Sequence, residues 1–394
     1  MNLPYQNLRV LELAHDPGGE MLGRQLVGLG ADVAKIEPPG GVPSRRMGPV
    51  AGDHDDPDHH LAYWYYNGGK ASVVLDLHEP DERADFERLA SEADICISTM
   101  HPLELDALEI DWHRVAEENG RLIAVSLTPF GLEGPWAQRR SSDLVGLATS
   151  GLLITSGYDD HSIPPIRPGG DQAYHTAASF GHIATGLALI QRELTGAGAV
   201  IDVSMHEAAG LTVELANPYW FYPKGLVKRQ TCRHAQPVAT APALFECQGG
   251  QYVYFALILA DPKPWKALID WMDEHGMATD LSEPAYDSLE HRQANFGHIQ
   301  EVVEVFFLLQ DATAAYHEGQ ARGLPIGILN APEDLIRDDH LRERGFFVEV
   351  NQPDAPGTLQ PGVPFTFSHL ETAPPTPAAR LGADTDRYRT NGWS

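Results

Sequence analysis

The sequence predicts an α/β protein in which a large domain with a Rossmann-like, doubly wound parallel sheet is joined to a smaller α+β domain. Two observations support this prediction. Apolar strand-like runs alternate with helical stretches over residues 8–204, and the connections between them are short. Such strand–helix–strand order favours a parallel sheet that binds ligands at the carboxyl ends of its strands. Beyond residue 204 the alternation stops, which predicts a change in architecture.

Each element of the expected sheet follows from its own pattern. Residues 8–13 and 32–36 are apolar strands that flank a helix, and together they form one βαβ unit. Further strands are expected at 71–77, 95–97, 121–127 and 200–204. Helices are expected at 21–29, 80–92 and 172–194. After these, residues 217–242 are rich in proline and aromatic residues without periodicity, which indicates a linker.

The charge and the cysteines of the chain limit its partners and its environment. A formal net charge of −27 argues against nucleic acid or an anionic membrane as the main partner, because both require clustered Lys and Arg. The three cysteines are widely spaced and form no Cys-x-x-Cys pair, which is typical of a reducing compartment. No secretory leader or membrane-spanning apolar run is recognisable. We therefore expect a cytoplasmic protein.

One stretch contains residue types that bind metals. Asp53–His60 holds several aspartates and histidines, but it is irregular, interrupted by proline and highly charged. This composition favours a solvated loop over a metal site, so no metal is expected.

Asp171 follows Gly169 and Gly170 and directly precedes the long apolar helix. Two glycines allow the backbone to bend and to bring main-chain N–H groups close to a ligand, so this carboxylate could act as a nucleophile in an open pocket. Aspartate is also among the preferred N-cap residues, so Asp171 could simply cap the helix. The local sequence leaves both roles open.

Residues 30–41, with the sequence GADVAKIEPPGG, resemble the N-terminal signature of the family III CoA-transferases. This CaiB/BaiF group includes formyl-CoA and carnitine CoA-transferases and the related α-methylacyl-CoA racemases. Further similar segments follow in family order at 66–77, 128–135, 142–152, 196–208, 323–327, 344–347 and 381–385. The resemblance covers nearly the whole chain.

The resemblance implies that Asp171 is the catalytic nucleophile of an acyl-CoA:carboxylate CoA-transferase. Its carboxylate would attack the thioester of an acyl-CoA donor, and the released CoA thiolate would then form an aspartyl-CoA thioester for a carboxylic acid acceptor to attack. The N–H groups near Gly169 and Gly170 could stabilise the oxyanions. Coenzyme A and its thioesters are thus the expected ligands.

An acidic protein that binds CoA needs local cations for the phosphates. Lys70 matches the CoA-contacting lysine region of the family, and Arg45 and Arg46 follow the Pro-Pro-Gly-Gly turn. We also count Lys35 and Asp143 among the expected CoA-binding residues. For the isolated Lys and Arg side chains, simple solvation is the alternative.

The first loop and its surroundings bear on the type of reaction. His15 lies after the first strand, where ligands gather in doubly wound sheets and where several family members place active-site groups, so we expect it to be a catalytic residue; the alternative is a structural histidine. Racemases of the superfamily carry a histidine where this chain has Ser142, so a racemase or epimerase is the second expectation. His175 lies four residues beyond Asp171, so both could lie on the same face of the helix and form a different acid/base pair for racemisation. A non-catalytic CoA-binding protein is the third expectation.

The architecture of the family is an interlocked homodimer. By this resemblance, residues 1–205 form the N-terminal part of the large domain, 206–242 a linker, 243–322 the small domain, and 323–394 a part that returns to the large domain. The aromatic residues of Pro218–Tyr222 either line an acyl pocket or only pack the linker.

Overall fold

The computed structural model describes residues 2–393 apart from residues 53–55, 214, 258 and 354. The chain divides into two compact units. The first comprises Met1–Leu153, Arg167–Val213 and Asp338–Ser394, and the second comprises Ile154–Ile166 and Glu214–Arg337. The second unit thus takes residues 154–166 and 323–337, both of which we expected in the large domain.

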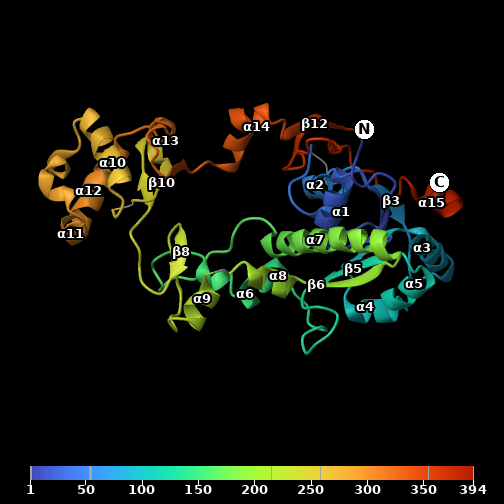
Figure 1. Ribbon diagram of the computed structural model, residues 1–394. Coiled ribbons are helices and arrows are strands. Elements are labelled where there is room, and N and C mark those ends of the chain that lie inside the picture. Colours follow the sequence, from blue (N-terminus) through green and yellow to red (C-terminus); the bar gives the residue numbers. More distant parts are fainter. Residues whose placement is uncertain (1, 53–55, 214, 258, 354, 394) are drawn as a thin grey trace. The chain divides into compact units, whose positions relative to one another are not determined.

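The first unit contains a sheet of six parallel strands in the order β3-β2-β1-β4-β5-β6 (Figure 1). The strands are β1 (Arg9–Leu13), β2 (Asp32–Glu37), β3 (Ala71–Val74), β4 (Ile95–Ser98), β5 (Ile123–Thr128) and β6 (Ala199–Ser204). The strand order changes direction at β1, which lies between β2 and β4, so the topological switch point lies at the carboxyl ends of β1 and β4. The predicted parallel α/β sheet is confirmed.

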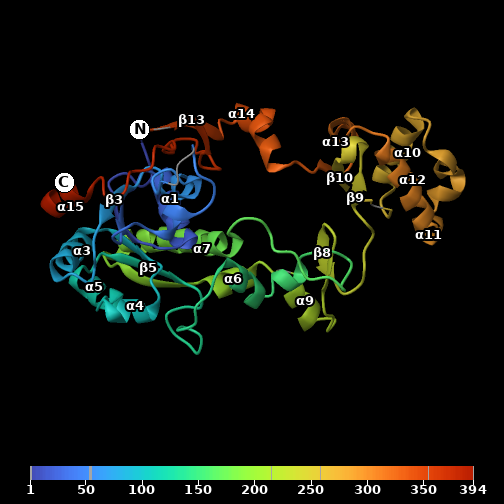
Figure 2. The same cartoon turned by 180° about the vertical axis from the view of Figure 1, so that it is seen from behind.

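Helices cover both faces of this sheet, as Figure 2 shows from behind. Residues such as Val10 and Ile97 face one core, and Leu11 and Cys96 face the other, because successive strand side chains point to opposite faces. The helices of the first face are α1 (Pro17–Gly28), α6 (Asp143–Thr149), α7 (Gln172–Thr195) and α8 (Met205–Leu211). The helices of the second face are α3 (Pro80–Glu92), α4 (Pro102–Ala107), α5 (Trp112–Glu118) and α15 (Thr385–Asn391).

The C-terminal part of the first unit, residues 338–394, contains further elements besides α15. These are α14 (Asp339–Glu343) and the antiparallel hairpin of β12 (Phe347–Gln352) and β13 (Ala355–Pro361). Helix α2 (Leu61–Asn67) packs against α1, and Gly68 forms a bridge with Ala378, which ties this tail to the start of β3.

The second unit has an antiparallel sheet with the order β11-β10-β9. The strands are β9 (Leu244–Glu246), β10 (Tyr252–Phe255) and β11 (Ile326–Ile328), and the helices are α10 (Pro262–Glu274), α11 (Leu289–Ala294), α12 (Phe296–Leu308) and α13 (Ala312–Ala321). The segment expected as a linker also contains α9 (Ala216–Phe221) and a hairpin of β7 (Lys228–Gln230) and β8 (Arg233–Gln236). Within the described residues, no helix is both long enough and apolar enough to cross a membrane.

Candidate active site

Asp171 stands at the N-cap position of α7 but does not perform the capping role. Its side chain accepts no hydrogen bond from the helix amides. Instead, Asp143 Oδ1 accepts a 2.8 Å hydrogen bond from Ala173 N in the first turn of α7. Because another carboxylate serves the helix end, that of Asp171 remains available for other contacts. The side chain of Asp171 is 27% exposed.

The glycine pair before Asp171 leaves open space beside the carboxylate. Gly170 has a φ of +77°, a conformation that L side chains rarely adopt. Both glycines are exposed, and an added Cβ at Gly169 would meet no atom within 4 Å. The backbone here is therefore accessible to a ligand.

Two side chains from different elements meet at Asp171. Tyr66, in the last turn of α2, places its hydroxyl 3.2 Å from Asp171 Oδ2 and 2.9 Å from His175 Nε2. His175 lies one helical turn beyond Asp171 and therefore on the same face of α7. Burial lowers the pKa of His175, although the nearby Asp171 opposes this shift. Burial raises the pKa of Tyr66, and Asp171 raises it further.

Arg167 links the loop that precedes Asp171 to α6. Its Nε and Nη2 donate to Asp143 Oδ2 at 3.1 and 2.8 Å, whereas its Nη2 lies 3.8 Å from Asp171 Oδ1. Asp143 is nearly fully buried. Its two oxygens bind Arg167 of the loop and Ala173 at the start of α7. This position does not fit the expected contact of Asp143 with CoA, because both of its oxygens serve protein donors.

Three of the expected phosphate-binding cations lie inside the protein. Lys35 Nζ is 2.7 Å from Glu12, and Lys70 Nζ is 2.7 Å from the other oxygen of Glu12. Arg45 donates to Glu37 through Nε at 2.7 Å and to Asp58 at 2.6 Å. Their side chains are 0–1% exposed, so a phosphate group has no access to them in this structure. This corrects our expectation for these cations: they neutralise buried carboxylates.

Arg46 is the exposed member of the expected cation set, and its Nη2 donates to the carbonyl of Gly40 at 2.7 Å. His15 lies at the switch point, where its backbone N–H donates to Thr99 Oγ1 after β4 at 3.0 Å. Burial, with a further contribution from Lys35, lowers the pKa of His15 to about 4. The His15 ring is therefore neutral near pH 7 and does not supply a positive charge there.

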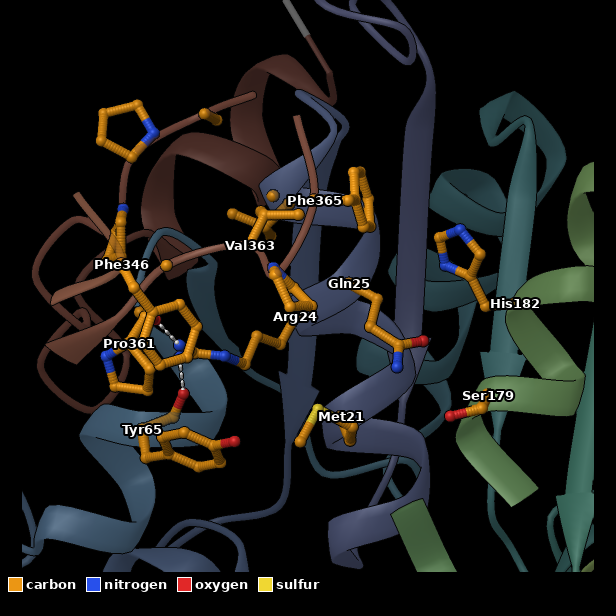
Figure 3. Close-up of a pocket in the computed structure, with 18 of the residues that line it drawn as sticks. Met21, Arg24, Gln25, Tyr65, Ser179, His182, Phe346, Pro361, Val363 and Phe365 are labelled. Atoms are coloured by element: carbon orange, nitrogen blue, oxygen red, sulfur yellow. Dashed lines mark hydrogen bonds between the residues drawn. The ribbon is translucent and has the colours of Figure 1, made fainter. Parts of the chain in front are cut away.

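A cavity of about 410 Å³ lies beside α7, where Ser179 and His182 line it (Figure 3). Ser179 and His182 continue the helical spacing of Asp171 and His175 and therefore lie on the same face of α7. The cavity begins at Ser179, about 12 Å along the helix from Asp171. Most of its walls are apolar; the lining side chains include Met21, Tyr65, Phe346, Val363 and Phe365. Arg24 also lines it and donates to the carbonyls of Tyr65 and Pro361. Among the described residues, Arg24 has no carboxylate partner.

The remaining expected sites lie elsewhere. Residues 53–55 of the Asp53–His60 stretch are outside the described residues, and Asp58 of this stretch pairs with Arg45. In the described part of the chain, no group of three potential metal ligands is present. Residues 218–221 belong to α9 of the second unit, and Trp220, Phe221 and Tyr222 are exposed.

Residues 5–385 match the family model described as CoA-transferase family III. The chain belongs to this family. It is an enzyme, a family III CoA-transferase, and such enzymes use CoA thioesters as substrates. The predicted family and enzyme class are confirmed.

Curated relatives match this family III chain over nearly its full length. It is 28% identical over 393 residues to the succinyl-CoA:(R)-benzylsuccinate CoA-transferase subunit BbsE of Thauera aromatica, with 98% of this chain and 93% of the relative covered. It is 29% identical over 378 residues to the acetyl-CoA:oxalate CoA-transferase of Acetobacter aceti, with 95% and 92% covered. A crystal structure of a CaiB/BaiF family protein from Brucella suis has the same fold, with a TM-score of 0.86, 23% identity and 99% of each chain covered.

Proposed function

We propose that this enzyme transfers CoA from an acyl-CoA donor to a carboxylic acid acceptor through a covalent aspartyl-CoA thioester on Asp171. The observation that carries the proposal is that Asp143, and not Asp171, binds the first turn of α7. Asp143 binds Ala173 N at the start of α7, and Asp171 is left partly exposed beside an open glycine pair. A carboxylate in this setting is available for attack on a thioester.

The reaction proceeds by exchange between carboxylate and thiolate groups. Asp171 attacks the thioester carbonyl carbon and expels CoA thiolate, which gives a mixed anhydride. The thiolate then attacks the aspartyl carbon and expels the donor acid as a carboxylate. The acceptor carboxylate reverses this sequence, so the energy of the thioester is retained. The proposal assigns the stabilisation of the substrate oxyanion to N–H groups near Gly169 and Gly170, and such a donor typically contributes about 3 kcal/mol.

The surroundings of Asp171 favour transfer over racemisation. A racemase needs two groups that remove and return a proton at the α-carbon. Ser142 caps α6 by accepting a hydrogen bond from Val145 N, and serine is a poor base near neutral pH. His175 Nε2 faces Tyr66 rather than open space. Racemase activity is therefore the second candidate, and the experiment below separates the two.

The cavity beside α7 supports an acid with an apolar body as donor or acceptor. Its apolar walls favour hydrocarbon or aromatic groups, and Arg24, whose acceptors among the described residues are backbone carbonyls, offers charge to a carboxylate. Relatives named for benzylsuccinate, malate and glutarate act on acids with two carboxylates. We propose a dicarboxylic acid, with one carboxylate at Asp171 and its apolar body directed towards the cavity. The phosphates of CoA are assigned to Arg46 at the carboxyl edge of the sheet.

The working form is proposed to be the interlocked homodimer in the cytoplasm. Helix α7 carries an exposed apolar row spaced by three and four residues, as in a coiled-coil seam. The row consists of Phe180, Ile183, Leu187, Ile190 and Leu194, all exposed in the single chain. A soluble protein rarely leaves such a row uncovered, which supports its burial by a second copy.

Peptide mass spectrometry tests the proposal. The enzyme is incubated with succinyl-CoA, acetyl-CoA and a branched acyl-CoA, with and without hydroxylamine, next to Asp171→Ala. Asp270→Asn, at an exposed aspartate of the second unit, is the matched control. We expect a CoA adduct on the Asp171 peptide that is lost only in Asp171→Ala. Absence of any adduct, together with solvent deuterium at the α-carbon of the branched substrate, would support the racemase and overturn the transferase.

A further inference from the structure

The two oxygens of the Asp171 carboxylate have different surroundings. Oδ2 lies 3.2 Å from the Tyr66 hydroxyl, whereas Oδ1 lies 3.8 Å from Arg167 Nη2. Arg167 Nη2 is itself held at 2.8 Å by Asp143, so its attraction to Oδ1 is shared. Oδ1 is therefore the less engaged oxygen and the better nucleophile, and Oδ2 becomes the carbonyl oxygen once Asp171 is acylated.

The proton count fixes the direction of the hydrogen bonds at Tyr66. An ionised carboxylate only accepts, so the single hydroxyl proton of Tyr66 is donated to Asp171 Oδ2. The 2.9 Å contact with His175 then requires Nε2–H of the neutral imidazole to donate to the Tyr66 oxygen. The hydrogen bonds therefore run from His175 through Tyr66 to Asp171. Because Nε2 carries the proton, this atom of His175 is not free to act as a base.

We propose that Tyr66 is a catalytic residue that stabilises the oxyanion formed on Asp171 itself, and that His175 is a positioning residue that holds the Tyr66 hydroxyl. This inference rests on the proposed function, since it requires Asp171 as the nucleophile. The donor is already on Oδ2 before the reaction begins, so little reorganisation is needed when charge develops there. Tyr66 comes from α2, a different element from the glycine loop that faces the substrate carbonyl.

The electron movements show which steps Tyr66 assists. In the mixed anhydride, Oδ1 bridges the acyl group and the aspartyl carbon. When CoA thiolate attacks that carbon, the S–C bond forms and the π electrons move to Oδ2. The C–Oδ1 bond then breaks, and the donor acid leaves as a carboxylate that carries Oδ1. Attack of the acceptor carboxylate on the aspartyl-CoA thioester places charge on the same Oδ2. No proton moves in either step, so a donor is needed and a base is not.

The two outer steps differ, because in them the charge develops on the carbonyl oxygen of the substrate. Loss of the Tyr66 hydroxyl should therefore slow the steps at the aspartyl carbon and spare the first acylation. A structural defect that displaces Asp171 would slow all steps together. This difference gives the inference a readout that a merely structural role would not produce.

The test compares Tyr66→Phe with Tyr388→Phe, which removes a buried hydroxyl on the opposite face of the sheet. Tyr388 is fully buried in the core of that opposite face, away from Asp171 and α7. Both variants are mixed with an acyl-CoA and no acceptor, quenched at short times, and analysed for acyl and CoA adducts on the Asp171 peptide. We expect Tyr66→Phe to form the CoA adduct about 10²-fold more slowly, with a higher ratio of acyl to CoA adduct. Tyr388→Phe should match the wild type.

A second pair of variants examines the positioning residue. His175→Ala should lower the rate of CoA-adduct formation less than Tyr66→Phe does, and His175→Gln, which keeps a side-chain N–H donor, should restore part of that rate. Equal adduct ratios and rates in Tyr66→Phe and the wild type would overturn the inference while Asp171 chemistry stands. Absence of an Asp171 adduct in the wild type would instead overturn the proposed function. A Tyr66→Phe protein that loses both adducts in parallel would assign Tyr66 a structural role and also overturn the inference.

Discussion

Lys35 donates a 2.7 Å hydrogen bond to Glu12, its direct cross-strand partner between β2 and β1, and both side chains are fully buried. Lys35 also lies 3.0 Å from Glu20, and Lys70 binds the other oxygen of Glu12. The two lysines and two glutamates balance in charge. Interactions with Glu12 and Glu20 outweigh burial and raise the pKa of Lys35.

The Lys35→Met variant should therefore be strongly destabilised, because the buried Glu12 and Glu20 carboxyl groups lose their partner. Breaking a buried ion pair from one side typically costs about 3–5 kcal/mol. The double variant Lys35→Met/Glu12→Gln should recover part of this loss. Urea denaturation of the variants measures it, with Lys266→Met as the control at an exposed ion pair. Equal stability of Lys35→Met and Lys266→Met would contradict the assignment.

Arg45 and Arg46 are neighbours in sequence with opposite environments. Arg45 is buried against Glu37, and Arg46 is exposed. We expect Arg45→Met to lower stability, whereas Arg46→Met keeps stability and raises the KM for acyl-CoA several-fold. Since a contact with phosphate is screened by salt, this rise should shrink at high ionic strength. Steady-state kinetics at low and high salt provide the measurement, and an unchanged KM would remove Arg46 from the CoA site.

Asp143→Asn should slow acylation of Asp171 by roughly tenfold, about 1.4 kcal/mol in the barrier. The amide loses the charge that holds Arg167, and the freed guanidinium can then pair with Asp171, 3.8 Å away, and weaken the nucleophile. The rate of adduct formation on the Asp171 peptide reports this effect. If the explanation is right, Arg167→Gln added to Asp143→Asn restores part of the rate; a further decrease would speak against it.

His15 should make stability depend on pH. Its pKa in the fold is about 4, mainly because of burial, and the unfolded value is 6.5. The unfolded state therefore binds the proton more readily. The contribution of the neutral His15 to the free energy of unfolding is fully present above pH 6.5 and is lost as pH falls towards 4. Thermal unfolding between pH 4 and 8 should show a smaller acid loss in His15→Asn than in the wild type. His113→Asn, an exposed histidine on α5, serves as the control. Parallel curves for His15→Asn and the wild type would exclude this role.

The exposed row on α7 should be essential for assembly. Leu187→Glu places a charge in the middle of the row and should convert the proposed homodimer to monomers or to aggregated chains. Val305→Glu introduces the same change at an exposed apolar residue of the second unit. Light scattering coupled to size exclusion measures the mass of each species. A Leu187→Glu protein that stays dimeric would show that another surface forms the interface.

The sequence determined most of the elements of the parallel sheet and singled out Asp171 as the candidate nucleophile. Alternating apolar runs located the strands of the parallel sheet, because strand and helix periodicity are local properties. The strand expected at 71–77 was too long, since β3 ends at Val74. Asp171 was recognised from its glycine pair and the family resemblance. The sequence left its role as a helix cap open, and the contact that speaks against that role joins Asp143 to Ala173.

The tertiary structure alone decided what the charged and polar residues contact. Lys70 and Lys35 were expected to bind the phosphates of CoA. The local sequence does not distinguish a lysine that meets solvent from one that meets a buried glutamate. The opposite charges of Glu12 and Lys35 within two apolar strands were the available clue, but only the strand register makes them partners. Tyr66 had no signal of its own, since it lies 105 residues from Asp171 in the chain. Periodicity is encoded along the chain, whereas hydrogen bonds and ion pairs depend on distances that folding alone creates.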